Sequence, residues 1–365
     1  LLNCLQVLLR RVPGGLALSV TIMGTIMAAT TGIIGASVVM MTLLALPVML
    51  ERNYNPSLAT GTIAASGTLG ILIPPSIMLV IMADLLAISV GTLFLAAIVP
   101  GLLLATIYII YLYLRTKLNP QLAPPLPDSM GPKSNAELWI MIFRSFIPPI
   151  FLIMCVLGSI FAGIATPTEA AAVGALGSII LALFNKRLSK TVIKSVTERS
   201  ALTCAMIFGI FIGATAFSYV FRSLGGDDLI HHVVESLGLG SWGILFLMMG
   251  MCFLLGFFFD WVEITLIVLP LFAPILATLD FGTHIAPELV VPWVAVLIAV
   301  NLQTSFLTPP FGFALFYLKG VAPPSIKIQM IYKGIIPFVI LQLIGLIAII
   351  CFPELVMWLP TKLLD

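Results

Sequence analysis

Long apolar segments recur along the whole chain, and short polar stretches separate them. They fall near 14–50, 57–83, 91–114, 138–164, 168–184, 200–221, 241–279, 289–318 and 334–352. A helix needs about 20 mostly apolar residues to cross the hydrocarbon core of a bilayer. The pattern therefore predicts an all-α polytopic membrane protein, embedded in a lipid bilayer as a multi-pass chain.

Two of these segments do not fit a single span. Segments 14–50 and 241–279 are too long to cross once and too short to cross twice in full. The first is interrupted by the stretch 30–35 (TTGIIG), and the second by the stretch 256–261 (GFFFDW). We expect both to be re-entrant hairpins, because a turn inside the membrane is tolerated only where it is buried in protein or lines a wet cavity.

Two other segments share a proline-interrupted pattern. Residues 66–75 (SGTLGILIPP) and 301–310 (NLQTSFLTPP) each begin with a small or polar cluster eight residues before a Pro-Pro pair. Each follows one of the hairpins, and each precedes another apolar span that contains a proline. Recurrence of hairpin, broken helix and span in the same order predicts an internal repeat, as in many secondary transporters.

Composition and charge fix the environment and the orientation. Charged residues make up 9% of the chain and hydrophobic residues 61%, whereas soluble domains carry about 25% charged residues. The net charge of +2 gives no reason to expect a nucleic acid partner. If the first hairpin opens to the cytoplasm, all Lys and Arg residues except Arg222 and Lys362 are cytoplasmic. The positive-inside rule favours this topology, in which the second hairpin opens outside and the repeats are inverted.

The organisation along the chain follows from these elements. We expect a first repeat over 1–118, a cytoplasmic linker over 119–135, further spans over 136–240 and a second repeat over 241–365. The linker is rich in proline, and residues 185–200 have the composition of an amphipathic segment at the membrane interface. The chain begins with Leu1 and no signal peptide precedes the first segment, so we expect an incomplete N-terminus that lacks further spans.

The helix breaks carry the candidate chemistry. A Pro-Pro pair removes two backbone donors and frees carbonyl groups one turn earlier. Unwound carbonyls and hydroxyls suit Na⁺, and the N-termini of half-helices suit a carboxylate. We therefore expect one cation (Na⁺) site at Thr30, Thr31, Gly32, Ser66, Gly67, Thr68 and Gly70, and a second at Gly256, Asp260, Asn301, Gln303, Thr304, Ser305 and Thr308. A small carboxylate substrate is expected to contact Ser37, Ser66, Thr68, Asn301 and Thr304.

Several residues have two interpretations. Each Ser or Thr taken alone is also a common helix-packing residue. Asp260 either binds a cation or lines a pore, or it caps a helix, or both. Glu263 is expected on the wet face of the hairpin, and Glu169, in the stretch TPTEA, is better explained as a helix cap than as a catalytic acid.

The sequence gives little evidence for a catalytic site or a metal site. His231, His232 and Glu235 form a conceivable metal site, but a solvated outer loop is the favoured interpretation. The five cysteines are far apart and form no C-x-x-C pair. No catalytic motif of the common hydrolase or phosphate-binding types is present. We therefore expect no catalytic residue, no transition metal and no cofactor.

Taken together, four motifs resemble one family. They are 30–37 (TTGIIGAS), 64–70 (AASGTLG), 256–261 (GFFFDW) and 301–312 (NLQTSFLTPPFG). They resemble the large membrane subunit of tripartite ATP-independent periplasmic (TRAP) transporters, and most closely the subgroup named for mannitol and chloroaromatic compounds. The resemblance implies an elevator-type transporter of the bacterial inner membrane, with hairpins and broken helices in its mobile part. It also implies coupling to Na⁺, a small four-helix membrane subunit, and a periplasmic binding protein that delivers an organic acid.

Two departures limit what the resemblance implies. Sialic-acid-type relatives carry Asp where this chain has Ser37, and Thr-Pro where it has Val262 and Glu263, so sialic acid is not the expected substrate. A dicarboxylate, a 2-oxo acid or a similar carboxylate is expected instead.

The alternative to a subunit of a tripartite transporter is a stand-alone dicarboxylate or citrate permease coupled to Na⁺ or H⁺. An intramembrane enzyme would need a nucleophile–base pair or paired aspartates, and a scaffold without transport would not need the inverted repeat.

Overall fold

Helices account for the regular structure of the chain. The computed structural model describes residues 1–125, 135–236, 238–310 and 312–364, and in these ranges the regular elements are all helical. Seven helices in this part are long and apolar enough to cross a bilayer. They are α3 (Ile34–Glu51), α6 (Val90–Leu118), α7 (Asn135–Phe161), α8 (Pro167–Phe184), α9 (Lys190–Ser223), α13 (Pro287–Leu307) and α15 (Ile328–Cys351). The prediction of an all-α multi-pass membrane protein is confirmed.

Both over-long apolar segments fold as two packed helices joined by a turn. The first consists of α2 (Gly15–Thr31) and α3, which are separated at Gly32, a residue with a left-handed φ of 61° that glycine adopts without strain. The second consists of α11 (Ser241–Leu255) and α12 (Trp261–Leu276), joined by residues 256–260. Three of the four arms are shorter than a typical span, as a hairpin requires. Entry of these hairpins into the bilayer remains a prediction.

The two Pro-Pro segments interrupt helices where the sequence predicts. Helix α4 (Pro56–Thr68) passes into the short helix η1 (Leu69–Ile71), and α5 (Ile77–Leu85) begins after the Pro74-Pro75 pair. Likewise α13 ends at Leu307, and α14 (Phe313–Val321) begins after Pro309 and Pro310. Both Pro-Pro bonds are cis. Proline ends each helix because it lacks the backbone donor and its ring collides with the preceding turn.

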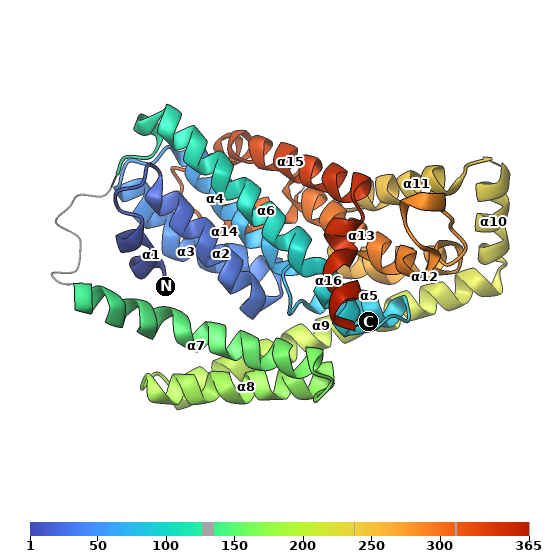
Figure 1. Cartoon of the computed structure of the whole chain (residues 1–365), viewed down its shortest axis with the longest axis horizontal. Coiled ribbons are helices and arrows are strands. Elements are labelled where there is room, and N and C mark those ends of the chain that lie inside the picture. Colours follow the sequence, from blue (N-terminus) through green and yellow to red (C-terminus); the bar gives the residue numbers. More distant parts are fainter. Residues whose placement is uncertain (126–134, 237, 311, 365) are drawn as a thin grey trace.

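The same succession of elements occurs twice, and its packing is matched. Helix α4 packs on α15, and α13, its counterpart, packs on α6. Helix α3 packs on α14, and α12 packs on α5 in the same way. Figure 1 shows the α2–α3 pair and the α11–α12 pair in opposite halves of the molecule. This arrangement is what inverted repeats require, while the inversion across the membrane stays a prediction.

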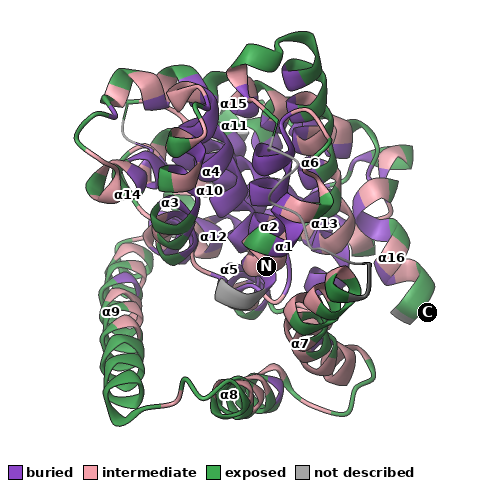
Figure 2. Ribbon diagram, turned by 90° about the vertical axis from the view of Figure 1, so that its left-hand side faces the viewer, coloured by how far each residue is buried: buried purple, intermediate pink, exposed green. Residues whose placement is uncertain are grey.

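Helices α7, α8 and α9 lie outside this packed core and form an arm. In α13, 89% of the spanning window is buried inside the protein, whereas the share is 6% in α8 and 6% in α9. Figure 2 shows α9, α8 and most of α7 at the outside, around the buried α4 and α13. Large apolar side chains of the arm, such as Phe208 and Ile212, are exposed. In a membrane protein such faces contact lipid or a partner subunit.

Helix α9 differs from the prediction of a separate interfacial segment. It is continuous over 34 residues, so its basic first turns and its apolar span form one rigid element.

Shorter helices complete the fold: α1 (Leu2–Leu8), η2 (Pro120–Leu122), α10 (Gly226–Ser236), η4 (Gly282–His284) and α16 (Glu354–Leu364). The predicted proline-rich linker lies outside the described residues over 126–134.

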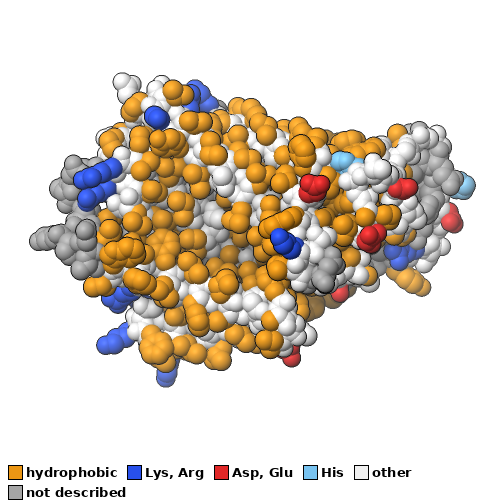
Figure 3. Space-filling model, viewed as in Figure 1, with side chains coloured by type: hydrophobic (Ala, Val, Ile, Leu, Met, Phe, Trp, Pro, Cys, Tyr) orange, Lys and Arg blue, Asp and Glu red, His pale blue; other side chains and the backbone are white. Residues whose placement is uncertain are grey.

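The charges separate along the long axis. On the face shown in Figure 3, most Lys and Arg side chains gather toward the end that holds α1, and Asp and Glu gather toward α10 and α11. This polarity agrees with the topology derived from the positive-inside rule. The end near α1 is therefore the expected cytoplasmic end.

The two repeats are joined by a close glycine contact. A Cβ atom added to Gly61 in α4 would collide with the carbonyl oxygen of Gly334 in α15, and one added to Gly334 would collide with the Ser57 carbonyl. We expect Gly61→Leu to lower the free energy of unfolding by about 3 kcal/mol or more, because overpacked cores must shift their backbone. Gly209→Leu is the control, since nothing lies within 4 Å of its added Cβ. Thermal unfolding in detergent measures both, and equal melting temperatures would contradict the expectation.

Candidate functional site

The two helices that lead into the breaks, α4 and α13, contact each other near the breaks. The Nε2 atom of Gln303 donates to the Oγ1 atom of Thr68 at 3.4 Å, and both side chains are fully buried. Thr68 and Gln303 are each the third residue of the recurring ten-residue segments. The break regions of both repeats therefore share one interface, although 235 positions separate these two residues.

The first hairpin packs against the first break. The hydroxyl of Ser66 donates to Thr21 Oγ1 in α2 at 3.3 Å. A Cβ added to Gly24 would lie 2.7 Å from that of Ser66, so α2 and α4 are in direct contact. At the tip, a Cβ on Gly32 would lie 3.6 Å from the Pro75 carbonyl oxygen. The turn of the hairpin and the unwound segment after α4 are therefore neighbours.

The predicted residues of the first cation site mostly fall at this interface. Ser66, Gly67, Thr68 and Gly70 are buried in α4 and η1, and Gly67 is in close contact with Val38 of the hairpin. Gly32 forms the turn. The side chains of Thr30 and Thr31 lie outside the described part of the structure.

The second hairpin packs against the second break in the same way. A Cβ added to Gly256 would collide with the side chain of Ser305. The Nδ2 atom of Asn301 donates to the Met249 carbonyl oxygen of α11 at 2.7 Å. Gly256 is thus brought against Ser305, and Asn301 against Met249. Thr304 and Thr308 donate to carbonyl oxygens of their own helix, at 2.8 Å each.

Asp260 caps a helix and also lines a cavity. Its Oδ1 atom accepts a hydrogen bond from the Trp261 backbone N–H at 2.9 Å, at the start of α12. The interpretation as a helix cap is therefore confirmed, while cation binding or pore lining by Asp260 stays a prediction. The cavity has a volume of about 350 Å³ and lies between the two hairpins, α9 and α14; its lining is Ile33, Gly35, Ala36, Val39, Thr203, Met206, Ile207, Asp260, Trp261, Val262 and Tyr317.

Of this lining, only Asp260 was an expected site residue, and Thr203 and Tyr317 are two polar side chains that the sequence did not single out. Thr203 lies in the arm helix α9, and Tyr317 lies in α14, where its ring rests 3.0 to 3.3 Å from a Cβ added to Gly35. Neither interrupts an apolar run in a way that marks a site. Ser37, which was expected to touch substrate, is 2% exposed and donates to the Ile33 carbonyl at 3.0 Å.

Comparison with known proteins identifies the family. Residues 1–355 match the family described as "Tripartite ATP-independent periplasmic transporter, DctM component". The chain belongs to this family. It is 31% identical to the C4-dicarboxylate TRAP transporter large permease protein DctM of Pseudomonas aeruginosa, over 96% of this chain and 78% of that protein. The protein of the same name from Vibrio cholerae is 30% identical, over 96% and 78%.

A third relative has a different name. The isethionate TRAP transporter permease protein DctMQ of Oleidesulfovibrio alaskensis is 30% identical, over 98% of this chain and 54% of that protein. The resemblance inferred from the motifs is confirmed at the level of the family. The DctM-family chain is accordingly a large permease subunit of a tripartite transporter and a multi-pass protein of the inner membrane. Membership of the mannitol and chloroaromatic subgroup stays a prediction.

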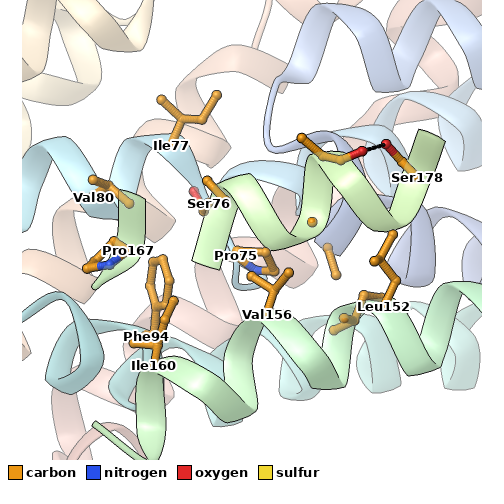
Figure 4. A pocket seen from close by; sticks show the side chains of 15 residues that line it. Pro75, Ser76, Ile77, Val80, Phe94, Leu152, Val156, Ile160, Pro167 and Ser178 are labelled. Atoms are coloured by element: carbon orange, nitrogen blue, oxygen red, sulfur yellow. Dashed lines mark hydrogen bonds between the residues drawn. The ribbon is translucent and has the colours of Figure 1, made fainter. Parts of the chain in front are cut away.

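A second cavity, of about 460 Å³, lies between the core and the arm of this DctM-family chain. Figure 4 shows Pro75, Ser76 and Ile77, which follow the first break, on one side of it. Most of the remaining lining is apolar and comes from α7 and α8. The Ser178 hydroxyl of α8 donates to the Ala175 carbonyl oxygen of its own helix at 2.7 Å. This cavity therefore offers little to an ion or a charged substrate.

Other candidate residues have structural roles or side chains outside the described part of the structure. Glu169 forms a capping box with Thr166 at the start of α8, so its interpretation as a cap is confirmed. The side chains of His231 and Glu235 lie outside the described residues. Among the residues that the structure describes, no group of three or more His, Cys, Asp or Glu is placed to hold a metal ion.

Proposed function

We propose that this chain carries out Na⁺-coupled import of a small organic acid. The observation that carries the proposal is the contact between Thr68 and Gln303, which joins the two helices next to their breaks, with a hairpin packed against each of them. Breaks of this kind provide carbonyl oxygens for Na⁺ and helix N-termini for a carboxylate. The role is transport rather than catalysis, as in the rest of the family.

The two Na⁺ sites of the proposal lie at the two hairpin–break contacts. The first uses oxygen atoms around Gly32, Ser66 and Thr68, together with the backbone at Thr30 and Thr31. The second uses oxygen atoms around Gly256, Ser305 and Thr308. Support comes from the close approach of Gly256 to Ser305 and of Gly24 to Ser66, since both depend on the absence of a side chain.

The mechanism that we propose is movement of the core against the arm. The core holds both breaks and both hairpins, whereas α8 and α9 bury only 6% of their spanning windows. A weakly packed arm permits the core to move against it as a rigid body, and alternating access commonly works by rigid-body movement of one bundle against another.

The partners follow from the tripartite family. We propose a small four-helix membrane subunit, for which the exposed apolar faces of α7 to α9 provide a surface, and a periplasmic binding protein that delivers the substrate. The names of the relatives mention C4-dicarboxylate, isethionate and ectoine. Family membership therefore does not determine which small organic acid is the substrate.

Uptake into proteoliposomes tests the proposal. The chain is reconstituted with its small subunit, and the binding protein loaded with substrate is added outside. An inward Na⁺ gradient should drive accumulation, and omission of the binding protein should abolish it. Equal uptake under a proton gradient without Na⁺ would contradict the coupling. Equal uptake by the chain alone would support the stand-alone permease instead.

A further inference from the structure

Two neighbouring helices, α6 and α15, pack on each other and each expose an apolar stripe. The stripe residues follow one another at intervals that place them on one face of their helix. They are Ile110, Tyr113 and Leu114 on α6, and Ile336, Ile340, Leu343 and Ile347 on α15. Both faces are apolar enough to contact the acyl chains of lipids.

Each stripe ends at a lysine. Lys117 lies one turn beyond Tyr113 on α6, and its Nζ atom is 5.6 Å from the centre of the Tyr113 ring. Lys333 lies three residues before Ile336 on α15 and is exposed. A lysine at the end of an apolar helix face reaches the level of the lipid headgroups, because its charged tip extends toward water.

The end of α6 and the start of α15 lie side by side, since both contact the start of α4. The Asn55 backbone N–H donates to the Leu122 carbonyl oxygen, just beyond α6, at 2.9 Å. A Cβ atom added to Gly334 in α15 would collide with the Ser57 carbonyl. The two lysines are therefore at the same end of the protein, which is the end where Lys and Arg side chains gather in Figure 3.

A cavity of about 500 Å³ opens at this end of α6. Its lining is Arg115, Leu118, Asn119, Pro120, Gln121 and Leu122. The guanidinium group of Arg115 suits a phosphate, to which it can donate two parallel hydrogen bonds. Within the described ranges, neither Arg115 nor Lys333 forms an ion pair, and the cavity lining contains no acid. The cavity therefore favours an anion.

We propose that α6 and α15 bind an anionic phospholipid of the bilayer, with its phosphate at Arg115, Lys117 and Lys333 and its acyl chains along the two stripes. Basic pockets at the cytoplasmic ends of membrane helices bind anionic headgroups. One leaflet of the hydrocarbon core is about 15 Å thick, and a helix crosses it in about ten residues. The α15 stripe from Lys333 to Leu343 therefore has the length that one leaflet requires.

Native mass spectrometry of the chain with its small subunit tests the proposal. The complex in detergent is titrated with phosphatidylglycerol, or with phosphatidylcholine that has the same acyl chains. One phosphatidylglycerol molecule should bind saturably, and about tenfold more tightly than phosphatidylcholine. Arg115→Gln/Lys333→Gln should weaken its binding about tenfold or more, since each basic residue near the headgroups contributes about a factor of five.

The matched control is Arg187→Gln/Lys190→Gln. It removes the same two kinds of exposed side chain at the start of α9 and should leave the phosphatidylglycerol affinity unchanged. The side chains of Arg115 and Lys333 are also exposed, so both double variants should melt at the wild-type temperature in phosphatidylcholine nanodiscs. A loss of binding then reports the site and not the stability of the fold.

Four outcomes would overturn the proposal. Two are equal binding of the two lipids and equal phosphatidylglycerol affinity in the two double variants. The third is full competition by glycerol phosphate, which would show that the site binds a free phosphate and not a lipid. The fourth is binding to the chain alone that the small subunit abolishes, which would assign this face to the subunit.

Discussion

Gly256→Val should reduce Na⁺-driven uptake by about tenfold to about a hundredfold. The added side chain collides with Ser305, so the tip of the second hairpin must withdraw from the break between α13 and α14. Overpacking of this kind costs about 1 to 3 kcal/mol, and each 1.4 kcal/mol corresponds to about a factor of ten in an equilibrium. Uptake into proteoliposomes at several Na⁺ concentrations measures the effect.

The control for this variant lies in α11, the helix that Gly256 follows. Nothing is within 4 Å of a Cβ added to Gly250 in α11, so Gly250→Val adds the same side chain without the collision. It should retain near-normal uptake. An equal loss of uptake in both variants would show that the effect comes from α11 and not from the contact at the break. Normal uptake by Gly256→Val would contradict the second Na⁺ site.

The double change Ser66→Ala/Thr68→Ala should lower the apparent Na⁺ affinity about tenfold or more. It removes the hydroxyl that contacts Thr21 and the hydroxyl that accepts from Gln303. Hydrogen bonds and ligands to charged groups contribute about 1.5 to 3 kcal/mol, which sets the expected size. The Na⁺ dependence of uptake gives the affinity directly.

A matched double change on the same helix separates ion binding from stability. Thr60 and Thr62 are also fully buried in α4 and, like Thr68, donate to carbonyl oxygens of their own helix, but they lie earlier in the helix, away from the break. Thr60→Ala/Thr62→Ala should leave the Na⁺ affinity unchanged. If both double variants lose Na⁺ affinity equally, the hydroxyls at the first break have no special role.

The sequence was sufficient for the local interruptions of the helices. Glycine and proline restrict or relax the backbone locally. The turn at Gly32 and the end of α13 before Pro309 can therefore be predicted without knowledge of the tertiary structure. The order of hairpin, broken helix and span follows from the same residues. The boundary at α9 was missed, because basic first turns give no sign that the helix continues unbroken into its span.

The composition of the cavity was less accessible from the sequence. Thr203 and Tyr317 line the cavity because helices far apart in the chain pack together. Such packing cannot be recognised from the hydrophobic pattern of segments that are apolar throughout. The contact between Thr68 and Gln303 was likewise unexpected as a direct bond. Each residue was a candidate because of its break, but only the fold shows that the two helices touch next to their breaks.

Binding of Na⁺ at the two helix breaks is the central prediction for this protein. Equilibrium binding of radioactive sodium to the purified chain, with its small subunit, tests this directly and needs no substrate. We expect saturable binding that is reduced by Ser66→Ala/Thr68→Ala and, separately, by Gly256→Val, with Gly250→Val and Thr60→Ala/Thr62→Ala as unaffected controls. Binding that does not saturate, or that all these variants retain, would contradict the assignment of Na⁺ to the breaks.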